Sequence, residues 1–491
     1  MNAPAAVLNP RWPASTMHLP RRQVVGLVAL TVLIATVAAW FGQPLLPILV
    51  LLGAGAAVLA IRRPMWAFYA LVMFLPIRAI PLKLMGFYVH PYRVVLVMLF
   101  LALILQARPG WCRTLLRARL TYPLLALTVV AGATMFVALD LGWWIKGFLQ
   151  TIACLGVYVV TLLLVDREAR FVGACVCLAL TGLVHALYGI GDYAAYLAGL
   201  PSLSVPAQVL SYLAPPRAQG LMADPNFYMM VLLALLPLAL AWAATSRAGW
   251  RRYLWVPAIL LFMALVPMTS SRGALIATAL LLVTGAWLSR SRRGLMGSRA
   301  FEQNWQRTAL LGLLLCVSGL ALVFAVSPLH VARAIQSTDV SDLSTLSEGR
   351  FDIYLRILHS FVHHPLGIGL YNTLAVNSGI GKFAHNSLLQ IMAEMGVPGL
   401  IAYGWLFLVT LGEVLRFPQG SRYSVWLVAL GLGVLGVYYS GLFISVYYDE
   451  VIALLWGLTA AGVALAQREG GGATPATGAT ASAGNAAVAG G

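Results

Sequence analysis

The sequence predicts an all-α fold, a polytopic bundle of transmembrane helices. Of the 491 residues, 61% are hydrophobic and only 10% are charged, and the mean hydropathy is +0.87. A water-soluble protein of this length needs more polar surface than these side chains provide. Apolar stretches of about 17 to 25 residues also recur along the chain, and each can cross a hydrocarbon layer about 30 Å thick. The bilayer is therefore the expected solvent.

The apolar stretches predict about 12 to 14 membrane spans. The first follows Arg21 and Arg22 and is read as a retained span, because a second apolar stretch comes after it without a clear cleavage site. Fourteen spans are expected, at residues 24–40, 44–61, 65–80, 92–107, 122–139, 146–165, 171–190, 225–244, 253–269, 273–289, 308–328, 387–412, 424–443 and 449–467.

The distribution of charge sets the expected orientation. With a cytoplasmic N-terminus, strict alternation of these spans places the whole net charge of +17 on the cytoplasmic side. This is the bias of the positive-inside rule, and it makes anionic phospholipids, rather than nucleic acid, the expected partner of the basic surface. The outer segment from Arg78 to Arg93 is the exception, because it holds three basic residues.

The spans divide the chain into five regions. A long outer segment, residues 329–386, is the expected functional loop, and within it the apolar residues from Ser347 to Val362 follow a helical spacing that would lay one face on the membrane surface. The tail is expected to be disordered, because it has nothing to bury. The regions are a cytoplasmic segment 1–23, a transmembrane bundle 24–328, the outer loop 329–386, C-terminal spans 387–467 and a cytoplasmic tail 468–491.

Three residues near the outer ends of spans are candidates for chemistry. Arg217, Arg272 and His385 each precede a helix that is expected to run from outside to inside. The positive ends of three helix dipoles, together with two guanidinium groups, describe a site for a dianion such as a pyrophosphate. A neutral imidazole beside it can take a proton from an attacking hydroxyl.

Each candidate also has a simpler explanation. An arginine at the end of a span often anchors in the headgroup region, which suffices for Arg272. Solvation in a proline-rich loop suffices for Arg217, and an ordinary polar contact suffices for His385. Glu394, Asp449 and Glu450 are candidate partners for the arginines. We expect no cofactor and no metal site, since no histidine, cysteine or carboxylate spacing identifies one.

Four motifs, in this order and spacing, resemble the bacterial O-antigen ligase/polymerase family. They are a Gly-Arg opening in 348–354, a Pro-Leu-Gly-x-Gly turn in 364–372, a His-Asn pair in 385–390 and the segment 394–400. Ser271-Arg272-Gly273 is similar to the family's Ser-Arg-Gly element, and Arg217 to its other arginine. The resemblance extends from Arg217 to Leu400.

The resemblance implies a metal-independent glycosyltransferase that uses an undecaprenyl-pyrophosphate-linked glycan at the periplasmic face of the bacterial inner membrane. Both termini of this multi-pass protein would be cytoplasmic. Arg217 and Arg272 would hold the pyrophosphate, and His385 would act as the base. Arg350, Tyr371 and Asn386 would bind or orient the substrate.

The acceptor stays open at this stage. Ligation to lipid A core is favoured narrowly over polymerisation of O-antigen or exopolysaccharide and over transfer to protein hydroxyls. The alternative from another class is a transporter of a polysaccharide or an anionic solute. That class predicts ionisable residues at mid-membrane on several helices, and such residues are nearly absent here.

Overall fold

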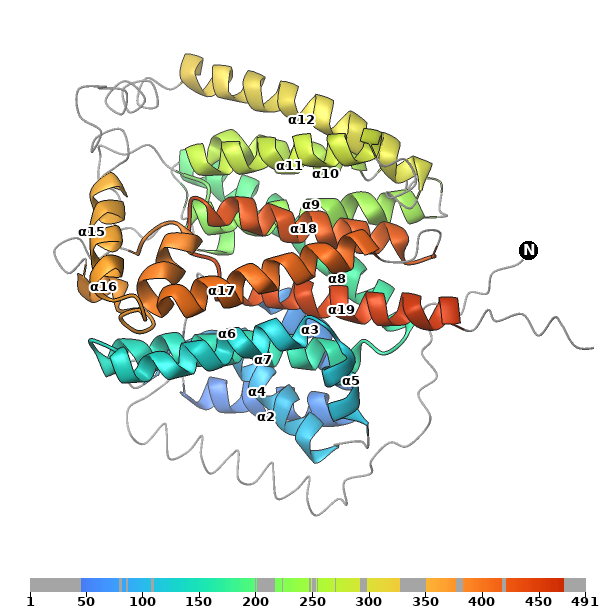
Figure 1. Cartoon of the computed structure of the whole chain (residues 1–491). Coiled ribbons are helices and arrows are strands. Elements are labelled where there is room, and N and C mark those ends of the chain that lie inside the picture. Colours follow the sequence, from blue (N-terminus) through green and yellow to red (C-terminus); the bar gives the residue numbers. More distant parts are fainter. Residues whose placement is uncertain are drawn as a thin grey trace, which may run out of the picture.

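The structure, a computed structural model, confirms the all-helical polytopic fold (Figure 1). The expected first span, 24–40, and the end of the expected tail, 472–491, lie outside the described residues. The structure describes residues 46–78, 82–84, 87–106, 110–198, 200, 217–222, 224–246, 249, 253, 255–269, 271–291, 298–326, 350–376, 383–416 and 421–471.

The first half of the described chain holds short helices and then two long ones. A small antiparallel hairpin pairs Leu82 with Val89. The elements are α2 (Leu46–Arg62), α3 (Pro64–Phe74), β1 (Leu82–Leu84), β2 (Phe87–Val89), α4 (Pro91–Leu105), α5 (Trp111–Arg117), α6 (Thr121–Ala133), η2 (Thr134–Val137), α7 (Leu141–Leu164) and α8 (Glu168–Leu197).

The second half holds most of the long helices and the short helices of the expected outer loop. Its elements are η4 (Gly220–Met222), α9 (Pro225–Thr245), α10 (Trp255–Met268), α11 (Arg272–Ser291), α12 (Arg299–Val326), α15 (Arg350–His363), α16 (Thr373–Val376), α17 (Ser387–Arg416), α18 (Ser424–Gly441) and α19 (Glu450–Gly471).

The described residues contain fewer full-length spans than the fourteen expected. Seven helices (α7, α8, α9, α11, α17, α18 and α19) are long and apolar enough to cross a membrane, or eight if the bent pair Trp111–Arg117 and Thr121–Val137 forms one span. The expected spans 44–61, 65–80 and 92–107 became helices of 17, 11 and 15 residues. Of the three, α3 departs most from its expected bounds, and hydropathy did not reveal its end at Phe74 because the residues that follow it, Leu75, Pro76 and Ile77, are also apolar.

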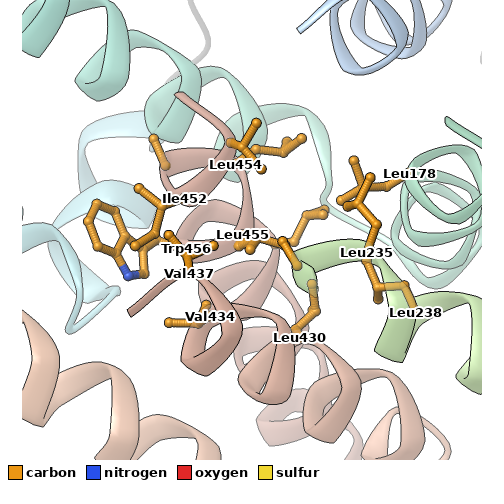
Figure 2. Close-up of a cluster of buried hydrophobic side chains, with 14 of the residues drawn as sticks. Leu178, Leu235, Leu238, Leu430, Val434, Val437, Ile452, Leu454, Leu455 and Trp456 are labelled. Carbon is orange, nitrogen blue, oxygen red and sulfur yellow. The ribbon is translucent and has the colours of Figure 1, made fainter. Parts of the chain in front are cut away.

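The core lies where α8, α9, α18 and α19 meet (Figure 2). Leu235 of α9, Leu430 of α18 and Leu455 of α19 are fully buried. Glycines let α9 and α18 approach closely, since a Cβ on Gly433 would lie 2.5 Å from the carbonyl oxygen of Ala234. Small residues allow this backbone contact between helices in a bilayer. These apolar helices are the rigid support for the loops at either end.

One end of the bundle gathers residues that the predicted alternation places on the cytoplasmic side. Arg422 pairs with Glu168 at 2.5 Å and with Glu469 at 3.1 Å, and Arg119 approaches Glu413 to 3.5 Å. We call this the basic end. The opposite end, which we call the site end, carries α15 and α16, and Figure 1 shows α15 running across the direction of the long helices.

Candidate functional site

Arg217 is fixed beside the N-terminus of α11. Its Nε donates a hydrogen bond to the carbonyl oxygen of Thr269 at 2.7 Å, and the amide of Ala218 donates to the carbonyl oxygen of Met268 at 2.9 Å. Arg272 begins α11 just after Thr269, so Arg217 is bonded to the segment that leads directly into Arg272. Both side chains are at least partly accessible.

Side-chain caps define the helix starts near these arginines. Asp224 accepts hydrogen bonds from the amides of Asn226 and Phe227 at 2.7 and 3.0 Å, and Pro225 opens α9. Ser271 accepts from the amide of Ala274 at 3.1 Å and donates to Asn226 Oδ1 at 2.5 Å. The side chain of Asn226 therefore joins the N-termini of α9 and α11.

His385 lies in a tight turn immediately before α17. Its φ of 52° is in the left-handed region, which is uncommon for a residue with a Cβ. Asn386 caps α17 by accepting from the amides of Leu388 and Leu389 at 2.9 and 3.1 Å. Its Nδ2 donates to the carbonyl oxygen of Leu442 at 3.0 Å. Asn386, predicted to bind substrate, thus has a clear structural role as a helix cap.

The connection between α18 and α19, residues 442–449, brings these helix starts together. A Cβ on Gly273, the residue after Arg272, would lie 2.5 Å from the Cβ of Phe443. Phe443 follows Leu442, which binds Asn386. The N-termini of α11 and α17, far apart in sequence, therefore meet on one connection. The structure brings the neighbourhoods of Arg217, Arg272 and His385 together at the site end.

The Pro-Leu-Gly-x-Gly motif fits against a break in α17. At Gly396, φ is 63° and the helix is interrupted. The amide of Ile368 donates to the carbonyl oxygen of Ala393 at 3.0 Å, and the amide of Gly369 to that of Glu394 at 3.1 Å. A Cβ on Gly367 would overlap the carbonyl of Glu394. The motif's glycines are needed because two backbones meet here.

The same motif is tied to the connection between η2 and α7. The fully buried Asn372 accepts from the amide of Asp140 at 2.8 Å and donates to its carbonyl oxygen at 3.2 Å. Tyr371, with a φ of 61°, lies with its ring centroid 5.2 Å from Phe383 and 5.1 Å from Tyr448. Burial raises the pKa of Tyr371. Through Phe383, this tyrosine is close to the turn that carries His385.

A buried polar network lies beneath the turn at His385. Gln390 Oε1 accepts from the amide of Ala384 at 2.8 Å, which fixes the residue before His385. Glu394, one turn further along α17, is fully buried and accepts from Thr373 Oγ1 at 2.7 Å. Gln390 Nε2 and the hydroxyl of Tyr447 also donate to Glu394. These partners are neutral, so the network differs from the expected pairing of Glu394 with an arginine.

Two of the three basic residues in the outer segment 78–93, Arg78 and Arg93, have buried acidic partners. Arg78 contacts Asp449 at 2.7 Å and Glu450 at 3.0 Å, and Arg93 approaches Glu450 to 3.7 Å. Tyr92 donates to Glu450 at 2.5 Å. Burial lowers the pKa of Arg78, but the two carboxylates outweigh burial and raise it. Asp449 and Glu450 therefore pair with Arg78 and Arg93, whereas the sequence offers them as candidate partners of Arg217 and Arg272.

Sequence reasoning missed the roles of Gln390 and Arg78. Gln390 stood inside a recognised motif, and its spacing of four residues from Glu394 places both side chains on one helix face. The excess of positive charge between Arg78 and Arg93 was the signal for buried acidic partners. Arg350 begins α15, but its side chain lies outside what the structure describes. Within the described residues, no group of three His, Cys, Asp or Glu side chains is placed to hold a metal ion.

The fold and the site define a polytopic helical membrane protein with a polar site at one end of its bundle. Residues 256–404 match the family model described as O-Antigen ligase. This match supports the O-antigen ligase/polymerase family that the motifs predict, and it suggests a glycosyltransferase-type enzyme. The match includes Arg272, Arg350, Tyr371, His385 and Asn386, but not Arg217. No curated protein matches the chain.

Proposed function

We propose that the protein transfers a glycan from an undecaprenyl-pyrophosphate carrier to a hydroxyl of lipid A core, at the periplasmic face of the bacterial inner membrane. One observation carries the proposal. The helix starts that bear Arg272 and His385 meet on the α18–α19 connection, and Arg217 is bonded just ahead of the same α11 start. Two guanidinium groups and an imidazole thus lie on neighbouring helix starts, where charge-assisted hydrogen bonds to an anion are favourable.

The proposed reaction is a single displacement at the anomeric carbon. The acceptor oxygen forms the new glycosidic bond while the bond to the carrier pyrophosphate breaks, and the pyrophosphate leaves with the electron pair. Negative charge grows on that leaving group, so the guanidinium groups of Arg217 and Arg272 bind the transition state more strongly than the ground state. His385 Nδ1 or Nε2 accepts the proton of the acceptor hydroxyl.

Arg217 and Arg272 supply the positive charge that a metal ion supplies in other enzymes that act on pyrophosphates, and we propose that no metal takes part. Tyr371 and Arg350 are proposed to orient the sugar or the phosphates. Asn386 is proposed to contact substrate in addition to capping α17. Both chain termini are proposed to be cytoplasmic, with the basic end facing anionic phospholipids.

The test compares Arg272→Ala and His385→Ala with controls on the same elements. Arg290→Ala removes an arginine from the opposite end of α11, and His359→Ala removes an exposed histidine from α15. Purified protein in lipid nanodiscs receives carrier-linked glycan and core lipid, and transfer is measured. Removing either site residue should lower the rate roughly 100-fold or more, the range seen for lost charge stabilisation or general-base catalysis.

The outcomes separate the alternatives. Full activity in both site variants would exclude these residues from catalysis. Glycan chains that lengthen without core lipid would identify a polymerase, and glycan joined to a protein hydroxyl would identify a protein glycosyltransferase. Carrier-linked glycan that crosses the bilayer but is never consumed with any acceptor would identify a transporter.

A further inference from the structure

Helix α15 carries three different faces along its length. Its inner face packs on α17, since Ile353 and Ile357 are buried against Ala384 and Ala393. Successive residues of an α-helix are rotated by about 100°, and on this geometry a second, polar face lies about 100° around the helix axis from the inner face. The exposed residues of that polar face are Asp352, Arg356, His359 and His363.

The third face of α15 is apolar and exposed. The exposed fractions are 50% for Leu355, 45% for Leu358 and 75% for Val362. These three side chains fall within an arc of about 60° on the helix. An amphipathic helix that needed only to cover the protein would have no use for a second apolar face, because its inner face already covers α17. The exposed stripe therefore needs an apolar environment outside the described chain.

The stripe leads to an exposed apolar surface on α17. Leu366, just beyond α15, is 61% exposed and adjoins Pro365, whose carbonyl oxygen accepts from the amide of Val397 at 2.9 Å. Val397 begins an exposed apolar stripe on α17, a helix long enough to span the membrane. That stripe consists of Val397, Ile401, Trp405 and Leu408.

We propose that α15 is an interfacial helix whose Leu355, Leu358 and Val362 stripe inserts between the acyl chains of the leaflet at the site end. Its polar face then lies toward water, and its inner face holds α17. The three faces match the three environments that meet at the rim of a membrane-spanning bundle. The crosswise direction of α15 relative to the long helices in Figure 1 is the direction such a helix requires.

This placement bears on the site without depending on its chemistry. The inner face of α15 contacts Ala384, the residue before His385. Insertion of the stripe therefore fixes the height of the His385 turn close to the headgroups. The inference stands or falls separately from the proposed glycan transfer.

Depth-dependent quenching tests the insertion. Single cysteines replace Val362 or Leu358 on the apolar face, or His359 or Arg356 on the polar face, each in the full chain with Cys112→Ser. Every variant carries a small environment-sensitive fluorophore and is reconstituted in nanodiscs with or without phospholipids brominated along the acyl chain. The chain with Cys112→Ser and no added cysteine gives the background from the other cysteines.

Insertion predicts several-fold stronger quenching at positions 362 and 358 than at 359 and 356. Equal quenching at all four positions, or none at any of them, would overturn the proposal. Weak quenching at 362 together with fluorophore self-quenching that disappears on dilution with unlabelled protein would also overturn it, because the stripe would then contact a second copy of the chain. Transfer activity is measured separately on the same samples, so loss of activity does not affect the conclusion on insertion.

Discussion

Two clusters of buried carboxylates at the site end are stabilised by different kinds of partner. Asp449 and Glu450 are fully buried carboxylates held by the guanidinium groups of Arg78 and Arg93. Glu394 is equally buried, but its described side-chain partners are the neutral Thr373, Gln390 and Tyr447. The first cluster joins the N-terminal helices to the start of α19, whereas the second shapes the turn at His385.

The difference shows how one connection serves two purposes. Tyr447 and Asp449 belong to the same α18–α19 connection, so both clusters act on the segment where the starts of α11 and α17 meet. A buried ion pair resists the loss of either partner, because the remaining charge would be stranded. A neutral network instead gives direction, since each hydrogen bond fixes an orientation. We call the first cluster, Arg78, Arg93, Asp449 and Glu450, the ion-pair cluster and infer that it holds the N-terminal helices to α19. We call the second, Thr373, Gln390, Glu394 and Tyr447, the positioning cluster and infer that it orients the turn at His385.

The largest expected effect is the loss of stability when the ion-pair cluster is broken. Arg78→Ala leaves two buried carboxylates without their closest cation and should lower the free energy of unfolding by about 3 to 5 kcal/mol. Arg422→Ala, at the exposed pair of the basic end, should cost less than about 1 kcal/mol. Denaturant titration in mixed micelles measures both. Equal losses for the two variants would contradict the distinction between buried and exposed pairs.

The positioning cluster should affect the reaction rate more than stability. Gln390→Met keeps the length of the side chain but removes the acceptor for the amide of Ala384. Because we propose His385 as the base, its displacement should lower kcat about 100-fold, the cost typical of a catalytic group shifted by about 1 Å. Binding of the carrier lipid, which we propose rests on the arginines, should be unchanged.

A control and a rescue complete this test. The double variant Gln390→Glu with Glu394→Gln keeps an oxygen acceptor for the amide of Ala384 and a single carboxylate in the network, and should recover part of the kcat lost in Gln390→Met. If kcat and carrier binding fall together with thermal stability in both variants, Gln390 is a structural residue and the contrast between the clusters disappears.

The glycine motif should show a smaller loss. Gly367→Ala forces a side chain into the carbonyl of Glu394 at a φ of 90°, and should destabilise the protein by about 1 to 3 kcal/mol. Gly412→Ala on α17 has open space around its Cβ and should be neutral or slightly stabilising. Thermal unfolding of the two variants under identical detergent conditions compares them. A neutral Gly367→Ala would mean that α17 and the 365–372 turn do not meet closely.

The smallest expected effect is a change of stability with pH, which arises from His90 beside the ion-pair cluster. Burial, together with Arg93 and Arg78, lowers the pKa of His90 to about 4. Its ordinary pKa is about 6.5, so the unfolded chain binds the proton more strongly. The neutral form stabilises the fold above about pH 6.5, and this stability is lost as the pH falls from 6.5 toward 4. His90 is only partly buried, so the loss should be about 1 kcal/mol.

Comparison with His90→Asn between pH 7.5 and pH 4.5 isolates this contribution. The melting temperature of the natural protein should fall further with acid than that of the variant. If the two curves run parallel, the pKa of His90 is not lowered in the folded protein, and Arg78 and Arg93 do not affect it.

Much of the architecture was accessible from composition and local pattern. High hydropathy, scarce charge and long apolar stretches favoured a helical bundle, because a helix satisfies its own backbone hydrogen bonds within a bilayer. The cap at Asp224 and the helix start at Pro225 were also readable, since capping involves residues close in sequence. The motif order from Arg350 to Leu400 sufficed to indicate the family, and residues 256–404 match its model.

Tertiary structure alone decided how these parts fit together. Arg78 and Asp449 are 371 residues apart, and no local pattern could pair them. The sequence also did not show that α3 ends at Phe74 rather than near residue 80, since hydropathy measures preference for lipid but not where a backbone turns. Finally, the meeting of Gly273 and Asn386 on residues 442–449 depends on how α11, α17 and α18 pack. Van der Waals contacts and hydrogen bonds between helices drive such packing in a bilayer, and both depend on shape across the whole bundle and not on any single segment.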